Sequence, residues 1–149
     1  MQVSQRCQYT LRALFELAKR QGGAPVSVAD IAESQAIPRR FLELIFLDLR
    51  TRGVVESRRG QQGGYVLTAS PAKITVGDII RAVDGSLAPV TCAGGKSEKH
   101  CRLKNQCVFA DVWRKAQRAA EKVYDKTTLQ DLIDNERTAA EHGPLVQVA

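Results

Sequence analysis

The most distinctive chemistry in this 149-residue sequence belongs to its four cysteines. Three of them lie in one segment rich in Gly and Lys, with eight residues between Cys92 and Cys101 and five between Cys101 and Cys107. Three thiolates on one segment can converge on a zinc ion or an iron–sulfur cluster. Their spacing matches neither the ferredoxin patterns nor the paired Cys-x-x-Cys of zinc fingers. It favours metal binding over free thiols, with a disulfide as the weakest reading.

The spacing alone does not identify a fourth ligand. His100 is adjacent to Cys101, so the binding of one metal by both side chains would be geometrically awkward. Cys7 is far away in the sequence, and a lone cysteine is more often a small buried apolar residue than a ligand. The segment therefore predicts three ligands and leaves the fourth open.

A second constellation is basic. Between Pro38 and Gly60 the sequence contains three acidic residues and six arginines, namely Arg39, Arg40, Arg50, Arg52, Arg58 and Arg59. A guanidinium fork can bind phosphate, or the O6 and N7 edge of guanine, through two hydrogen bonds. Glu43 lies one helical turn from the first two arginines, where it can accept from cytosine N4 or orient an arginine. The pattern favours DNA binding over a merely solvated basic face or a protein-interaction surface.

The basic constellation ends in a glycine-rich stretch, RRGQQGGY, that begins with Arg58, Arg59 and Gly60. Glycines allow a hairpin tip to turn tightly and to approach a DNA backbone or a narrow minor groove. A phosphate-binding loop of an enzyme is the rival reading. The stretch lacks the Gly-Lys-Ser/Thr ending of that loop and the spacing of a dinucleotide fingerprint.

Composition agrees with one basic globular domain. The chain carries 22 Lys and Arg against 16 Asp and Glu, a net charge of +6, and 44% of its residues are hydrophobic. No apolar run reaches the roughly 20 residues of a membrane span, and the N-terminus lacks the features of a signal peptide. We therefore expect a cytoplasmic protein with no membrane partner. With only two histidines to act as a base, an enzyme that uses Cys92 or Cys107 as a nucleophile is disfavoured.

These residues need a scaffold, and apolar periodicity predicts one. Helical spacing marks an amphipathic helix that ends near Gly22, a short helix opened by Ser27, and a third helix with Pro38 in its first turn. Two short strands, 54–57 and 65–68, follow around the glycine-rich tip. Further helices are expected after Thr75, from Phe109 to about residue 125, and after Thr128.

This order predicts a mainly α fold with a small β wing. Residues 1–84 form a winged helix-turn-helix DNA-binding domain, and residues 85–107 form a cysteine-containing loop. Residues 108–137 comprise a long helix, whose small apolar face suits dimerisation, and a short terminal helix. A loose tail is expected over 138–149.

The chain resembles the IscR/NsrR-type bacterial transcription regulators of the Rrf-two family. The resemblance runs from Met1 to about Glu136 and rests on three pieces: FLELIFLDLRTRGVVESRRGQQGGYVL, ITVGDIIRAVDG, and the three cysteines ahead of the helix that contains Trp113. The three-cysteine loop is the mark of members that carry an iron–sulfur cluster.

The resemblance implies a homodimeric repressor that binds partly palindromic double-stranded promoter DNA and senses iron, nitric oxide or redox state. It implies DNA contacts by Arg39, Arg40, Glu43 and Arg59, and an iron–sulfur cluster held by Cys92, Cys101 and Cys107, with the 2Fe-2S type favoured and the 4Fe-4S type as the alternative. A thiol-based or zinc-binding regulator without a cluster is the rival on the same fold.

Two positions depart from the pattern of those relatives. Ala110 stands where IscR-like proteins have a histidine three residues after the last cysteine, and Gln8 stands where NsrR-like proteins can use an acidic residue of the partner. The gap before Cys101 is also longer than in either of them. The fourth ligand therefore stays open among Gln8, Cys7, Glu33, His100 and an exogenous group.

Overall fold

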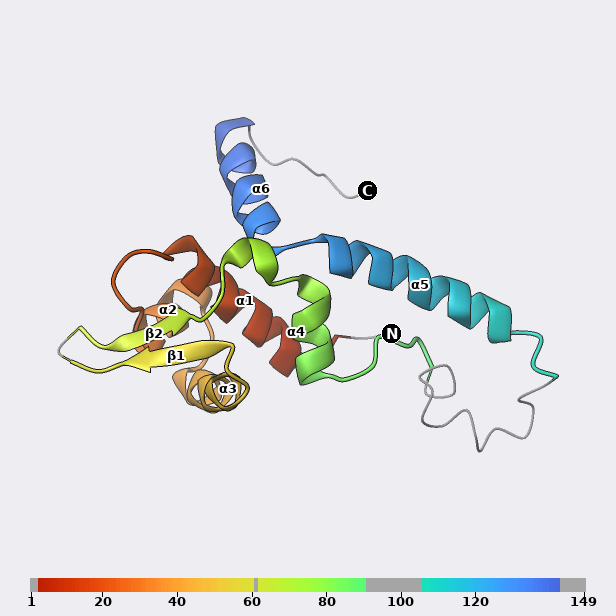
Figure 1. Ribbon diagram of the computed structural model, residues 1–149, viewed down its shortest axis with the longest axis horizontal. Helices are drawn as coiled ribbons and strands as arrows, with labels where there is room; N and C mark the ends of the chain where they lie inside the picture. The colour runs from red at the N-terminus through yellow and green to blue at the C-terminus, as the bar shows by residue number, and fades with distance from the viewer. Residues whose placement is uncertain (1–2, 61, 91–105, 143–149) are drawn as a thin grey trace.

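Helix α1 (Gln5–Lys19) is the central element, because four other helices and the wing hairpin pack against it (Figure 1). The computed structural model describes residues 3–60, 62–90 and 106–142. The Ser4 hydroxyl caps α1 by accepting a hydrogen bond from the Cys7 amide at 3.1 Å. The side chains of Ala13, Leu14 and Leu17 form the buried face of α1 and the middle of the core.

Helices α2 (Val28–Gln35) and α3 (Arg39–Thr51) form the helix-turn-helix. Ser27 caps α2 as predicted, with its hydroxyl accepting from the Asp30 amide at 3.1 Å. Ala36 ends α2 in the left-handed conformation, with φ of 48°, and turns the chain toward α3. Pro38 is the N-cap of α3 and not a residue of its first turn. The predicted apolar stripe of α3 is buried, comprising Leu42, Ile45, Phe46 and Leu49.

The wing is an antiparallel hairpin of β1 (Val55–Arg58) and β2 (Gly64–Leu67). Each strand is displaced by one residue from its predicted position. Val54 is excluded from β1 because its amide donates to the Leu49 carbonyl at 3.0 Å and so continues the end of α3. Tyr65 forms a two-way backbone bridge with Val26, which joins β2 to the connection between α1 and α2.

A short 3-10 turn, η1 (Pro71–Lys73), leads to α4 (Val76–Val83), whose start is closed by the predicted capping box of Thr75 and Asp78. Beyond the cysteine segment follow α5 (Ala110–Lys126) and α6 (Leu129–His142). Leu129 and Ile133 of α6 join the core, whereas α5 has no buried residue and extends away from the body (Figure 1).

The predicted fold class is confirmed, since the described part of the chain is mainly helical with a two-stranded wing. The predicted tail of 138–149 needs one correction: α6 continues to His142, and residues 143–149 lie outside the described ranges. Thr138, Ala139 and Ala140 extend the helix, with the Thr138 hydroxyl donating to the Asp134 carbonyl at 3.0 Å. Among the described helices, none has the length and apolar character that crossing a membrane would require.

Candidate nucleic-acid interface and cysteine segment

The outward face of α3 carries the predicted DNA-contacting residues. Arg39, Arg40 and Glu43 are all exposed and lie outside the buried stripe of α3. Arg39 Nε lies 2.9 Å from a carboxylate oxygen of Glu43, one helical turn away. Glu43 therefore orients an arginine in the free protein, which is one of the two roles that the sequence allowed.

The other arginines of this region fall into two groups. Asp48 binds both Arg52 and Arg6, at 3.0 Å and 2.9 Å, and Arg58 pairs with Glu56. Within the described ranges, ion pairs are absent for Arg40, Arg50 and Arg59, all of which are exposed. These three guanidinium groups retain their donors for an anionic partner.

Glycines determine the shape of the wing beside α3. Gly60, the last residue of the predicted DNA-contacting set, is exposed and has φ of +128°, a conformation that side chains disfavour. Gly64 lies against the bridge to Val26, where an added Cβ would be 2.4 Å from the Val26 carbonyl oxygen. The rings of Phe46 on α3 and Tyr65 on β2 pack with centroids 4.6 Å apart. The wing and α3 are therefore held in a fixed relation.

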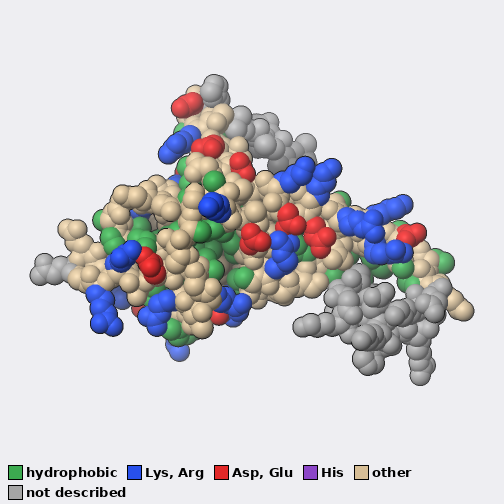
Figure 2. Space-filling model, viewed as in Figure 1, with side chains coloured by type: hydrophobic (Ala, Val, Ile, Leu, Met, Phe, Trp, Pro, Cys, Tyr) green, Lys and Arg blue, Asp and Glu red, His purple; other side chains and the backbone are tan. Residues whose placement is uncertain are grey.

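Charge is distributed unevenly over the surface. Figure 2 shows blue Arg and Lys side chains around the wing and the α3 end of the body and also along α5, and red acidic side chains near the junction of α4 with α5. At that junction, Arg81 forms ion pairs with Asp78 at 3.1 Å and Asp125 at 2.8 Å. The basic end matches a polyanion better than the junction does.

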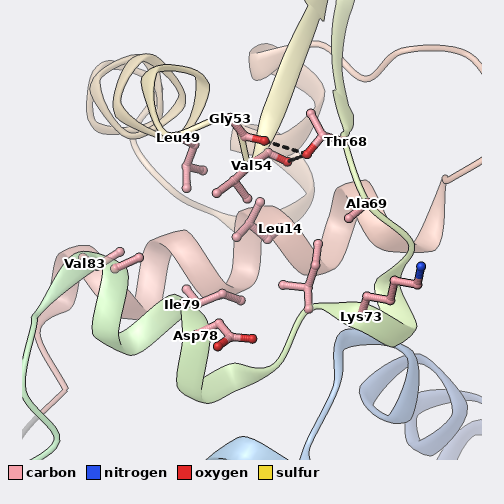
Figure 3. Close-up of a pocket in the computed structure, with 12 residues that line it drawn as sticks. Leu14, Leu49, Gly53, Val54, Thr68, Ala69, Lys73, Asp78, Ile79 and Val83 are labelled. Atoms are coloured by element: carbon pink, nitrogen blue, oxygen red, sulfur yellow. Dashed lines mark hydrogen bonds between the residues drawn. The ribbon is translucent and has the colours of Figure 1, made fainter.

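A cavity of about 250 Å³ lies behind the wing, between α1, α4 and the start of β1 (Figure 3). Leu14, Leu49, Val54 and Ile79 supply apolar side chains to it. At its edge the Thr68 hydroxyl lies 2.7 Å and 3.0 Å from the carbonyl oxygens of Gly53 and Val54, which secures the base of the wing. Neither the exposed arginines nor Cys107 line this cavity.

Of the three clustered cysteines, only Cys107 lies in the described part of the chain. It is half-buried and immediately precedes α5, where its carbonyl accepts from the Ala110 amide at 3.1 Å. Cys92, Cys101 and His100 lie outside the described residues. Among the residues described, no set of three or more His, Cys, Asp or Glu side chains could hold a metal ion.

The remaining candidates for a fourth ligand differ in how exposed their side chains are. Cys7 is fully buried against Ile80 and Leu87. Burial, and next the nearby charge of Asp84, raise the pKa of the Cys7 thiol to about 11. Gln8, the next residue on α1, is exposed and donates to the Val3 carbonyl at 3.0 Å, and Glu33 is exposed on α2.

A clamp that the sequence did not reveal joins α1 to the start of the cysteine segment. The Asp84 carboxylate, at the end of α4, accepts from both the amide, at 2.8 Å, and the hydroxyl of Ser4. Leu87 then packs on Cys7 and Ile80. Partners so far apart in sequence leave no local signal, and only the tertiary fold shows why Cys7 must be small and apolar.

The comparisons with known proteins agree with this geometry. The profile of the Rrf2 family, described as an iron-dependent transcriptional regulator, matches residues 3–135. The regulator CymR of Bacillus subtilis is 36% identical over 132 residues, which cover 89% of each chain. The regulator IscR of Yersinia pseudotuberculosis is 33% identical, over 91% of this chain and 81% of its own.

Comparison with solved structures also finds regulators named IscR and CymR. The structure of T. potens IscR superposes with a TM-score of 0.77 at 35% identity, over 93% of this chain and 90% of its own. The structure of CymR, the global cysteine regulator of B. subtilis, superposes with a TM-score of 0.76 at 34% identity, over 91% of this chain and 98% of its own.

A winged helix-turn-helix with an exposed basic reading face defines a DNA-binding transcription regulator and not an enzyme. This chain belongs to the Rrf2 family of transcriptional regulators.

Proposed function

We propose that this chain is a cytoplasmic, homodimeric repressor of the IscR/NsrR type, which senses iron, nitric oxide or redox state through an iron–sulfur cluster. The observation that carries the DNA-binding part is that Arg40, Arg50 and Arg59, on α3 and the wing, are exposed and have no carboxylate partner among the described residues. The cluster part is supported by the three-cysteine segment and by the description of the family as iron-dependent.

On this proposal Cys92, Cys101 and Cys107 hold the cluster, with the 2Fe-2S type favoured. When bound, such a cluster supplies a centre that gains or loses electrons and is attacked by nitric oxide or lost when iron is scarce. The chemistry of the donor set fits, because thiolates are the usual ligands of iron–sulfur clusters.

The surroundings of Cys7 support a fourth ligand other than this thiol. A thiol whose pKa is raised to about 11 stays protonated near neutral pH, and Cys7 has no route to a shared metal while it is packed on Ile80 and Leu87. We therefore favour Gln8, Glu33, His100 or an exogenous group over Cys7. Gln8→Ala, compared with Cys7→Ala, tests this choice through the visible spectrum of the protein.

Ligation would act on the chain through the ends of the cysteine segment. The Ser4–Asp84 clamp and Leu87 fix the end near α4, and Cys107 leads directly into α5. Tying Cys107 to Cys92 would therefore tie the start of α5 to the body of the protomer. In a homodimer formed through α5, that constraint would set the distance between the two α3 helices, which must suit half-sites roughly 34–36 Å apart.

The decisive experiment is to purify the protein anaerobically, count iron and acid-labile sulfide, and record its absorption spectrum. We expect both elements and a visible charge-transfer band, and we expect all three to be lost together in the Cys101→Ser variant. Zinc in place of iron and sulfide, or reduced thiols with no metal, would replace the cluster with the thiol-based or zinc-binding alternative.

A further inference from the structure

Leucine is an unusual residue to find at the centre of a basic reading face. Leu44 is 61% exposed on α3, and Leu47, one turn further along, is 51% exposed. Helical spacing places Leu44 beside Arg40 and Leu47, on the side opposite to the buried stripe. An apolar side chain therefore lies among the groups proposed to meet DNA.

The neighbouring aromatic residue does not share this position. Phe41 turns toward α1, where its ring meets that of Tyr9 edge-on at a centroid distance of 6.2 Å. Leu44 lines a hollow between α1 and α3 together with Tyr9 and Phe41, next to the charged face of α3. Its exposed methyl groups can reach a partner of α3 without a rearrangement of the core.

We propose that Leu44 is a specificity-determining residue that packs on the C5-methyl group of a thymine in the major groove. The charges of α3 and the wing favour DNA as the partner: among the described residues Arg40, Arg50 and Arg59 have no carboxylate partner and complement a polyanion, whereas an apolar protein surface would leave them without counter-charges. The thymine methyl is the apolar group that DNA displays in the major groove, and apolar side chains read it there.

The position of Leu44 along the helix supports this assignment. Residues in the N-terminal half of a recognition helix meet base edges, while later residues lie over the backbone or beyond it. Leu44 is the sixth residue of α3, which begins at Arg39. Leu47 has the same side chain and similar exposure but lies one turn further from the N-terminus, so it provides a matched control.

This inference rests on the proposed DNA-binding function, and its test separates the two. The full-length protein is first used to select duplexes from a random DNA library. Each thymine of the selected half-site is then replaced by deoxyuridine, which removes the methyl group and leaves the base pair intact. We expect one such position at which affinity falls about fourfold, the effect of losing one buried methyl contact.

In Leu44→Ala the same deoxyuridine substitution should leave affinity unchanged, while Leu47→Ala should keep the fourfold difference. Three results would overturn the inference: no methyl-dependent position in the wild type, a difference that persists in Leu44→Ala, or one that is lost equally in Leu47→Ala. A change in oligomeric state in Leu44→Ala with unchanged thymine discrimination would assign the residue to a protein contact instead. Failure to select any DNA would reject the proposed function itself.

Discussion

At the scale of single residues, Glu16 is a buried carboxylate whose ionisation affects the stability of the fold. Its carboxylate on α1 is 4% exposed and receives hydrogen bonds from Gln35 of α2 at 2.7 Å and from Lys19 at 2.8 Å. Burial alone would raise the pKa of Glu16, but these hydrogen bonds and the charges of Lys19 and Arg20 outweigh it and lower the pKa below 4.5. The ionised carboxylate therefore stabilises the folded state.

We predict that Glu16→Gln destabilises the protein by about 1–3 kcal/mol at neutral pH, the range for a hydrogen-bonded buried charge. Because the folded pKa lies below the unfolded one, this stabilisation is fully present above about pH 4.5 and is lost as the pH falls further. The difference between wild type and variant, measured by denaturant unfolding, should therefore shrink below pH 4.5.

Glu136 provides the control for this experiment. It binds the same Lys19 at 3.3 Å, but its side chain is 51% exposed. Glu136→Gln should change stability by less than about 1 kcal/mol, as expected for a solvated pair. Equal effects of the two substitutions would contradict the role given to the buried carboxylate.

At the scale of elements, α5 is the helix whose place in the protomer is least explained by its own contacts. Phe109, Val112 and Val123 are between 53% and 61% exposed on its apolar face. The attachment of α5 to the body is at its C-terminal end, through the ion pair of Asp125 with Arg81. An exposed apolar stripe on a long helix is what a helix-on-helix dimer would cover.

We predict that Val112→Glu makes the protein monomeric at micromolar concentration, because in the proposed homodimer the carboxylate would be buried without a partner in the interface. Arg118→Glu, an exposed substitution on the opposite face of α5, should leave the dimer intact. Sedimentation equilibrium measures both. A monomeric wild type, or a Val112→Glu variant that stays dimeric, would contradict the assignment of this face.

The elements also show which features of the fold could be predicted from local sequence patterns. The caps at Ser27, Thr75 and Thr128 and the stripe of α3 were predictable because their partners are within one helical turn. The sequence could not tell whether the stripe of α5 is covered by its own protomer, since a periodic pattern does not identify its neighbour. The displacement of β1 was likewise hidden, because it depends on the contact of Val54 with the end of α3.

At the scale of the whole molecule, some of the positive charges are paired with carboxylates within the protomer, and others have no such partner among the described residues. The sequence could locate the six arginines between residues 38 and 60, but not which are neutralised within the fold. Arg39, Arg52 and Arg58 have carboxylate partners, while Arg40, Arg50 and Arg59 have none among the described residues. That division depends on side-chain geometry and determines which arginines are available to phosphate.

We predict that Arg59→Ala weakens DNA binding about tenfold at physiological salt and lowers the slope of log affinity against log salt by about one. Lys122→Ala removes a charge from α5 without touching α3 or the wing, and it should leave affinity nearly unchanged. Titrations at several salt concentrations measure both quantities. An Arg59→Ala variant with wild-type affinity at matched salt would contradict the wing contact.

The central claim is that the state of the cysteine segment controls DNA affinity. It is tested most directly by dividing one anaerobic preparation, removing iron from half of it with a chelator, and titrating both halves with the same selected duplex. We expect the DNA affinities of the two halves to differ at least tenfold. The Cys92→Ser variant should have the affinity of the chelated half, both before and after its own treatment with chelator. Equal affinity in the two halves of the wild-type preparation would contradict the claim.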